Sequence, residues 1–235
     1  MPEPLECVVW WATPLPPDDR LLDLLSMTER TRYAAYRRLE DQRRFLTGRL
    51  LARTIVGQRL GVPPESVDLD ATCPDCGKPH GKPRVPGSDL ELSITHAGDR
   101  VGLAVAVGVP VGLDVEATTR NSGDDLLRYA LSDAELATVA GLPEPERAAA
   151  FFTYWARKEA VLKATGLGLK LPLRSITLTP PGPAPALLTA TGGALDPGTT
   201  AIADLDCGPG YAAAVAALTS RWLAVTQRWW RATAG

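Results

Sequence analysis

The pattern of apolar and polar residues along the chain predicts short strands interspersed with helices. Apolar runs and alternating apolar positions predict strands at residues 8–11, 90–94, 101–107, 111–115 and 211–218. Apolar residues at helical spacing predict long helices over residues 39–60 and 146–165, and a region of mixed charge favours another at 124–135. The capping-box pattern from Ser26 to Glu29 predicts one more helix start.

The order of these elements favours the α+β fold class. The strands at 101–107 and 111–115 are separated by a turn at 108–110, which is typical of antiparallel hairpins. Strands and helices do not alternate regularly, as they would in a doubly wound α/β protein. At 235 residues the chain is one large domain or two fused small ones. Residues 221–231 carry three tryptophans among arginines and favour a helix or strand with an apolar face.

Charge and hydropathy narrow the class of protein. The net charge of −2 gives no overall basic field for nucleic acid. The longest uncharged apolar run, at 101–113, is too short to cross a bilayer. The start of the chain lacks a signal-peptide pattern. We therefore expect a cytoplasmic protein with no nucleic-acid or membrane partner.

Cysteine spacing leaves two interpretations open. Cys73 and Cys76 form a C-x₂-C pattern with His80 close behind, which is half of a typical structural zinc site. The sequence offers no matching second pair, and the segment is rich in Pro, Gly and Asp. A tight polar turn without metal is the favoured interpretation.

Two acidic motifs carry the candidate chemistry. In the first, Gly112-Leu113-Asp114-Val115-Glu116, strand parity places Asp114 and Glu116 on one face and the apolar residues on the other. Two neighbouring carboxylates repel each other unless a cation lies between them. The pair is therefore interpreted as half of a metal site or, alternatively, as two solvated acids at a strand end.

The second motif lies on the helix predicted at 146–165. Trp155, Glu159 and Lys163 follow i, i+4, i+8 spacing and share one face, with Lys158 beside them. Glu159 and Lys163 alone would suit a surface ion pair, but Trp155 indicates partial burial of that face. A partly buried glutamate beside lysines suits a metal ligand or a general base.

Three further segments suit phosphate binding. Lys82-Pro83 follows Gly81 in a loop, and Thr95-His96 ends a predicted strand with a hydroxyl and an imidazole. Arginines on the first long helix form a basic face or are simply solvated; they are Arg43, Arg44, Arg49 and Arg53.

Together these motifs resemble the 4'-phosphopantetheinyl transferase superfamily, in its surfactin-synthetase-activating (Sfp-like) type. The family carries a G-[IVL]-D-[IV]-E motif, then W-x-x-K-E-x-x-x-K about 40 residues later, with G-K-P and an S-H-S-like turn upstream. Gly112–Glu116, Trp155–Lys163, Gly81–Pro83 and Thr95–Ala97 match them in order. Thr95 and Ala97 depart from the frequent serines.

The resemblance implies a fold and a reaction. It implies two similar α+β halves related by a pseudo-twofold axis, here residues 1–108 and 109–235, with the active site at their junction. It implies transfer of the phosphopantetheine arm of coenzyme A to a serine of an apo acyl or peptidyl carrier protein, with release of adenosine 3',5'-bisphosphate. A monomer that uses Mg²⁺, or Mn²⁺ in its place, is expected.

The resemblance also implies residue roles. Asp114, Glu116 and Glu159 would hold the metal, with Glu159 also the candidate base and Lys163 assisting departure of the bisphosphate. Catalysis would rest on Glu159, Lys163 and His96. Coenzyme A contacts would come from Arg44, Arg49, Lys82, Pro83, Thr95, His96, Asp114, Lys158 and Lys163.

Two other functions use the same residue types. A Mg²⁺-dependent nuclease or phosphodiesterase also needs an acidic cluster with a lysine, although the charge balance of the chain speaks against it. A small zinc-binding interaction module would use Cys73, Cys76 and His80 instead.

Overall fold

The computed structural model describes residues 3–119, 123–182, 184–193 and 195–232. In this part of the chain the strands form two main sheets and a short pair. The first sheet contains, in spatial order, β2 (Leu90–Ala97), β3 (Arg100–Val107), β1 (Leu5–Ala12) and β9 (Leu223–Trp229). The second contains β4 (Val111–Ala117), β8 (Tyr211–Ala217) and β7 (Ala201–Leu205), and the short pair is β5 (Ile176–Leu178) with β6 (Leu187–Ala190).

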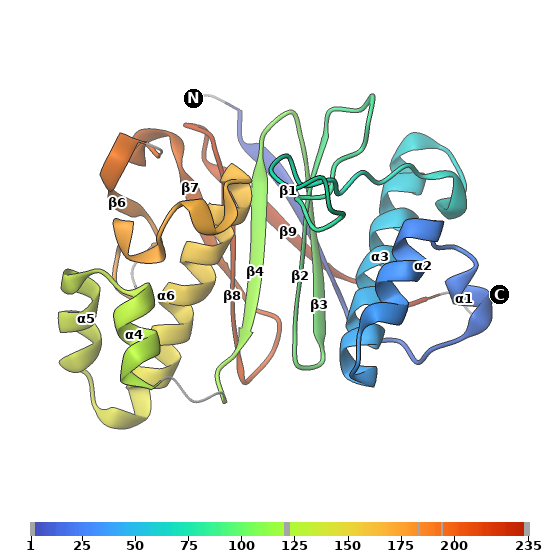
Figure 1. Cartoon of the computed structure of the whole chain (residues 1–235). Helices are drawn as coiled ribbons and strands as arrows, with labels where there is room; N and C mark the ends of the chain where they lie inside the picture. Colours follow the sequence, from blue (N-terminus) through green and yellow to red (C-terminus); the bar gives the residue numbers. More distant parts are fainter. Residues whose placement is uncertain (1–2, 120–122, 183, 194, 233–235) are drawn as a thin grey trace.

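The helices lie outside the sheets (Figure 1). They are α1 (Asp19–Leu22), α2 (Met27–Ala35), α3 (Leu39–Leu60), α4 (Asp124–Ala130), α5 (Asp133–Ala140) and α6 (Glu144–Thr165). Short 3₁₀ turns are η1 (Pro64–Ser66), η2 (Gly168–Lys170), η3 (Leu173–Ser175), η4 (Thr191–Gly193) and η5 (Pro197–Thr199).

Three apolar layers hold the helices and sheets together. Between α3 and the first sheet, Leu51 packs with Leu92. Between the two sheets, Trp11 packs with Leu113 and neighbouring strand residues. Between the second sheet and α6, Val161 packs in a third layer. The order of layers is therefore helix, sheet, sheet, helix, and the α+β class expected from the sequence is confirmed (Figure 1).

Most predicted elements are present, and one prediction is wrong. The long helix predicted at 39–60 is α3 with the same bounds, and the capping box at Ser26 begins α2. The single helix predicted at 124–135 is two helices, α4 and α5. Ser132 starts the second of them, because its side chain accepts from the Glu135 amide and Glu135 in turn caps the Ser132 amide.

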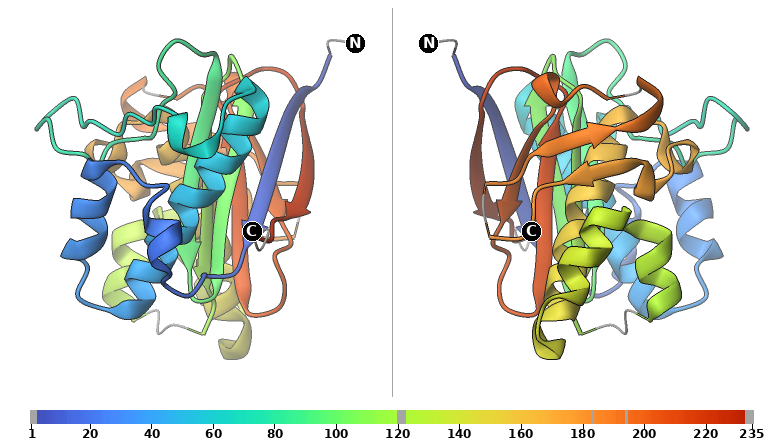
Figure 2. Two further views of the ribbon diagram at one scale, coloured as in Figure 1. Left: turned by 90° about the vertical axis from the view of Figure 1, so that its right-hand side faces the viewer. Right: turned by 90° about the vertical axis from the view of Figure 1, so that its left-hand side faces the viewer.

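The last strand in the sequence lies beside the first. β9 pairs with β1 in parallel, with Leu5 opposite Leu223, so the segment of three tryptophans and arginines forms an edge strand of the first sheet. Figure 2 shows the two strands side by side. The expected division at residues 108 and 109 lies in the turn between β3 and β4, and β9, which follows it in the sequence, lies in the first sheet.

The two sheets meet where β2 lies beside β4, and side chains join them there. The Leu113 amide donates to Ser93 Oγ at 2.9 Å, and the Val115 amide donates to Thr95 Oγ1 at 3.3 Å. These strands belong to different sheets. Hydroxyl groups from β2 therefore satisfy backbone amides of β4 that a neighbouring strand would normally satisfy.

Gly112 fixes the distance between β4 and α6. A Cβ atom at this position would lie 1.9 Å from the Ala160 carbonyl oxygen and 2.3 Å from the Ala164 nitrogen, both backbone atoms of α6. By strand parity Gly112 lies on the same face as Asp114 and Glu116, and the backbone of α6 fills the space that its missing side chain leaves. The absence of a side chain thus lets the helix approach the strand that carries Asp114 and Glu116.

Gly112→Ala should lower the free energy of unfolding by about 1–3 kcal/mol, because α6 must move to admit the methyl group. Chemical denaturation measures this loss. Gly141→Ala is the matched control: its backbone is right-handed and the nearest atoms to an added Cβ lie 3.5 Å away, so no loss is expected. Equal stability of the two variants would contradict the close approach.

Candidate active site

A cavity of about 300 Å³ opens where β2, β4 and α6 meet. The strand β4 contributes both of its acids, and α6 contributes the face predicted from helical spacing. The cavity is lined by Ile94, Thr95, His96, Asp114, Val115, Glu116, Trp155, Glu159 and Lys163. We call it the carboxylate cavity. Two motifs 43 positions apart in the chain, from Gly112 to Trp155, therefore form one site.

Asp114 is the most deeply buried acid of the carboxylate cavity, with 4% of its surface exposed. Its Oδ1 accepts from Lys163 Nζ at 2.6 Å and from Thr95 Oγ1 at 3.1 Å. Its Oδ2 is buried and has no hydrogen-bond partner among the residues that the structure describes. Burial raises the pKa of Asp114 above its ordinary value, against the opposing charge of Lys163. An orphaned buried carboxylate oxygen is costly unless a further cation or donor completes the site.

Glu159 and His96 complete the electrostatics of the carboxylate cavity. Burial, and then the charge of Asp114, raise the pKa of Glu159, whereas Lys163 lowers it. For His96, partial desolvation of the ring and the cations Lys163 and Arg44 lower the pKa. His96 therefore holds a neutral imidazole at pH 7, and Glu159 is a carboxylate with raised proton affinity.

The donor set of the carboxylate cavity suits a hard divalent cation. Asp114, Glu116 and Glu159 offer carboxylate oxygens, the ligands that Mg²⁺ prefers. The oxygens of these three acids do not converge closely enough to form a compact group of ligand atoms. In the part of the chain described here, such a compact group is formed by Cys73, Cys76 and His80. An open arrangement is compatible with Mg²⁺, which keeps several waters and binds through few carboxylates together with phosphate oxygens.

A second, larger cavity of about 780 Å³ adjoins the first and shares Ile94 and Lys163 with it. We call it the loop cavity, because the segment 72–84 forms much of its wall. Lys82 and Pro83 line it as the sequence motif suggested. Lys82 Nζ donates to Glu91 Oε2 at 3.1 Å and lies 3.4 Å from the Ala164 carbonyl oxygen, so the lysine joins the loop to β2 and to α6.

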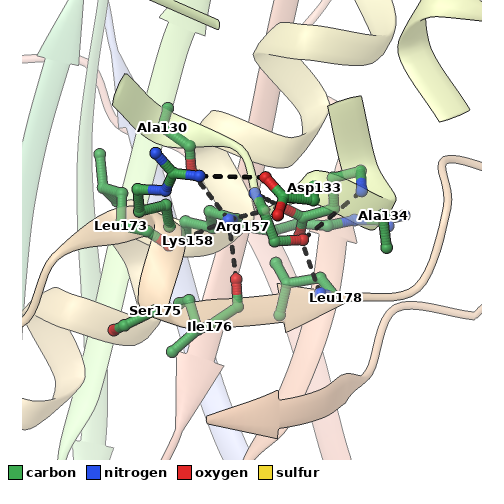
Figure 3. Close-up of polar contacts among 12 residues, drawn as sticks. Ala130, Asp133, Ala134, Arg157, Lys158, Leu173, Ser175, Ile176 and Leu178 are labelled. Carbon is green, nitrogen blue, oxygen red and sulfur yellow. Dashed lines mark hydrogen bonds and ion pairs between the residues drawn. The ribbon is translucent and has the colours of Figure 1, made fainter. Parts of the chain in front are cut away.

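Lys158 lies outside both cavities, and the expectation that it binds phosphate is corrected by its position. Its side chain has no exposed surface, and Nζ lies 2.5 Å from Glu135 Oε2. The ammonium also donates to the carbonyl oxygens of Ala130, Leu173 and Ile176 at 2.8–2.9 Å (Figure 3). Because Lys158 comes one residue before Glu159 on a helix, it points about 100° away from it, toward α4, η3 and β5.

The arginines of α3 do not form one basic face. Arg53 is buried and donates to Glu29 at 2.6 Å. Arg49 is also buried, 3.8 Å from Glu29 and over the ring of Phe45, and lines neither cavity. Its expected contact with coenzyme A is therefore not supported by its position. Arg44 remains at the surface, where it donates to the Gly98 carbonyl oxygen at 2.8 Å, near enough to lower the pKa of His96.

Sequence reasoning missed residues that shape the loop cavity. Ser93 lines the loop cavity while its hydroxyl joins β2 to β4, and Lys170 reaches the same cavity from beyond α6. A signal for Ser93 was present, because Ser93 and Thr95 are hydroxyl residues two apart in a predicted strand and must share a face. Nothing local marked Lys170, since its place depends on how the chain turns after α6.

This arrangement defines a class of site: acids that suit a divalent cation, a carboxylate of raised pKa and a neutral imidazole lie beside a larger cavity lined by lysines. Comparison with known proteins identifies the class. The chain matches the family model of the 4'-phosphopantetheinyl transferase superfamily over residues 110–216. It also matches the N-terminal model of 4'-phosphopantetheinyl transferase over residues 11–108.

Two sequence relatives, HetI and Sfp, agree with the family models. The 4'-phosphopantetheinyl transferase HetI of a Nostoc species is 36% identical over 180 residues, which cover 74% of this chain and 75% of HetI. The 4'-phosphopantetheinyl transferase Sfp of Bacillus subtilis is 25% identical over 162 residues, 68% of this chain and 69% of Sfp. A holo-acyl-carrier-protein synthase structure from Thermotoga maritima aligns with 48% of this chain and 65% of its own, at 21% identity and a TM-score of 0.38.

The chain belongs to the 4'-phosphopantetheinyl transferase superfamily. The resemblance recognised in the sequence and the expectation of a phosphopantetheinyl transferase are thereby confirmed, and none of these matches favours a nuclease. In the described part of the chain, no helix combines the length and the apolar character needed to cross a membrane.

Proposed function

We propose that this protein transfers the 4'-phosphopantetheine arm of coenzyme A to a serine of an apo acyl or peptidyl carrier protein, as a cytoplasmic monomer that uses Mg²⁺ or Mn²⁺. The observation that carries the proposal is the pair of adjoining cavities. They bring the four family motifs together, with carboxylates in one and lysines in the other, and they share Lys163.

The sizes and linings of the cavities suit the parts of coenzyme A. The loop cavity has room for a nucleotide, and Lys82 and Lys170 offer charge for its phosphates. The carboxylate cavity suits a pyrophosphate with its metal: Asp114, Glu116 and Glu159 would hold the ion, which neutralises charge on the phosphate oxygens when bound. Arg44 beside Gly98 extends positive charge along the rim near His96.

In the proposed reaction the serine oxygen of the carrier attacks the phosphorus that bears the pantetheine arm. The new bond is serine O–P, the bond that breaks is P–O within the pyrophosphate, and the leaving group is adenosine 3',5'-bisphosphate. Glu159 accepts the hydroxyl proton, a role that its raised pKa favours. Lys163 neutralises charge on the departing bisphosphate, since it lies at the boundary of both cavities.

Mass spectrometry of an apo carrier protein incubated with coenzyme A, Mg²⁺ and this protein tests the proposal. A gain of about 340 Da on the carrier, the mass of one phosphopantetheine arm, is the expected result. A carrier whose acceptor serine is alanine serves as the control and should gain nothing. Absence of the gain across several acyl and peptidyl carrier proteins would overturn the proposal.

The proposed metal role predicts a stability change that needs no substrate. Mg²⁺ at ten times its dissociation constant should stabilise the protein by about 1.4 kcal/mol, or roughly 3–6 °C in Tm. Asp114→Asn should abolish the shift, because it removes a buried ligand. Asp133→Asn, an exposed acid paired with Arg174, should keep it. An unchanged shift in Asp114→Asn, measured by thermal denaturation, would place the ion elsewhere.

A further inference from the structure

A cluster of thiols and an imidazole lies outside the carboxylate cavity, on the wall of the loop cavity. Sγ of Cys73, Sγ of Cys76 and a ring nitrogen of His80 all lie within 4.8 Å of one another. Cys76 Sγ is 3.0 Å from His80 Nε2. The three residues span eight positions of one loop, which bends back so that they converge. The metal-free turn favoured from sequence does not require that convergence.

Backbone hydrogen bonds shape the loop around this cluster. The Cys73 amide donates to the Lys78 carbonyl oxygen at 2.8 Å, and the Gly77 amide donates to the Cys73 carbonyl oxygen at 2.9 Å. Gly77 has a φ of 69°, a left-handed conformation that glycine adopts at low cost. The two cysteines thus face each other across a turn built by the backbone, and the segment is both a tight turn and a cluster of metal ligands.

We propose that Cys73, Cys76 and His80 bind one Zn²⁺ ion, with water as the exchangeable fourth ligand. Two thiolates and a neutral imidazole form a donor set that zinc prefers, and two negative charges balance its own. Bond lengths of about 2.3 Å to sulfur and 2.0–2.1 Å to nitrogen place tetrahedral ligands roughly 3.5–3.8 Å apart. The Cys76–His80 contact of 3.0 Å would open slightly, and the three ligand atoms already lie within 4.8 Å of one another.

The position of the cluster gives the ion a structural consequence. The loop is closed at its base by paired backbone bonds between Asp70 and Arg84, and its tip is held by Lys170, whose Nζ lies 2.5 Å from Asp75. Gly81 and Lys82 follow His80 directly and line the loop cavity. Zinc would therefore fix the segment that presents Lys82. It would act as a structural ion, separate from the cation of the carboxylate cavity.

Metal analysis of the protein, purified without chelator and without added zinc, tests the proposal. About one zinc per chain is expected in the wild type, and at least a tenfold lower content in the double variant Cys73→Ser/Cys76→Ser. Lys78→Ala, an exposed non-ligand within the same turn, should retain the full content. Cobalt substitution should give thiolate-to-metal charge-transfer absorption in the wild type and in Lys78→Ala alone.

Thiol chemistry gives an independent result that does not depend on the transferase reaction. Two exposed or half-buried thiols should be protected from a thiol reagent until a strong chelator is added, while Cys7 and Cys207 stay buried throughout. A wild-type protein with less than about a tenth of a zinc per chain, after incubation with zinc and desalting, would overturn the proposal. So would a disulfide between Cys73 and Cys76 in freshly purified protein.

Discussion

Lys158→Ala should destabilise the protein by about 3–5 kcal/mol, because it leaves the carboxylate of Glu135 buried without its counter-charge. Both side chains of this pair are at most 1% exposed. The ammonium also satisfies three carbonyl oxygens, from the end of α4 and from the segment at η3 and β5. Burial lowers the pKa of Lys158 while Glu135 raises it, so the lysine depends on its partner to keep its charge.

Thermal denaturation measures this loss as a fall in Tm of roughly 6–20 °C. Lys170→Ala is the matched control. Its ammonium also lies 2.5 Å from a carboxylate, that of Asp75, but the two side chains are 58% and 53% exposed. An exposed pair contributes at most about 1 kcal/mol. If Lys158→Ala kept its stability and instead raised the KM for coenzyme A, the phosphate-binding role expected from the sequence would be restored.

Glu159→Gln should lower kcat by at least about 100-fold, if Glu159 is the base of the proposed reaction. Glutamine keeps the shape of the side chain but cannot accept the proton. Glu146→Gln, an exposed position in the first turn of the same helix, should keep nearly full activity. A kcat of the Glu159→Gln enzyme within about threefold of the wild-type value would exclude Glu159 as the base.

The same substitution should leave the metal-free protein at least as stable as the wild type at neutral pH. The pKa of Glu159 is raised in the folded state, so the folded protein binds more protons than the unfolded chain above the ordinary glutamate pKa. Its stability therefore falls as pH rises through that window. Glu159→Gln removes the ionisable group and with it this loss of stability. Urea titrations at pH values below and above the window measure the difference between the variant and the wild type. A variant that lost both activity and stability would indicate a structural role.

Local patterns predicted the elements and the faces that carry the site. Helical spacing gave α3 its observed bounds, and strand parity placed Asp114 and Glu116 on the face that α6 covers. Helical spacing and strand parity both depend only on residues that are a few positions apart in the sequence. Family resemblance then supplied the link between β4 and α6, which no local pattern contains.

The failures concern partners that are distant in the sequence. Lys158 looked like a phosphate ligand because it stands beside Glu159, and its true partner, Glu135, lies on another helix. From the sequence, Arg49 was expected to be solvated or to contact coenzyme A. Its actual partner, Glu29, lies on a separate helix, α2. The convergence of His80 on Cys76 depends on backbone bonds within a loop, which turn-forming residues indicate but do not specify.

The parallel pairing of β1 with β9 sets an order of events during synthesis. β1 leaves the ribosome well before β9, so one of its two edges stays without that partner until the strand Leu223–Trp229 has emerged. Non-local pairings of this kind form slowly, and an open strand edge pairs readily with another chain. A nascent chain of this protein therefore exposes an unpaired strand edge until β9 is made, and a chaperone that shields this edge would raise the yield of native enzyme.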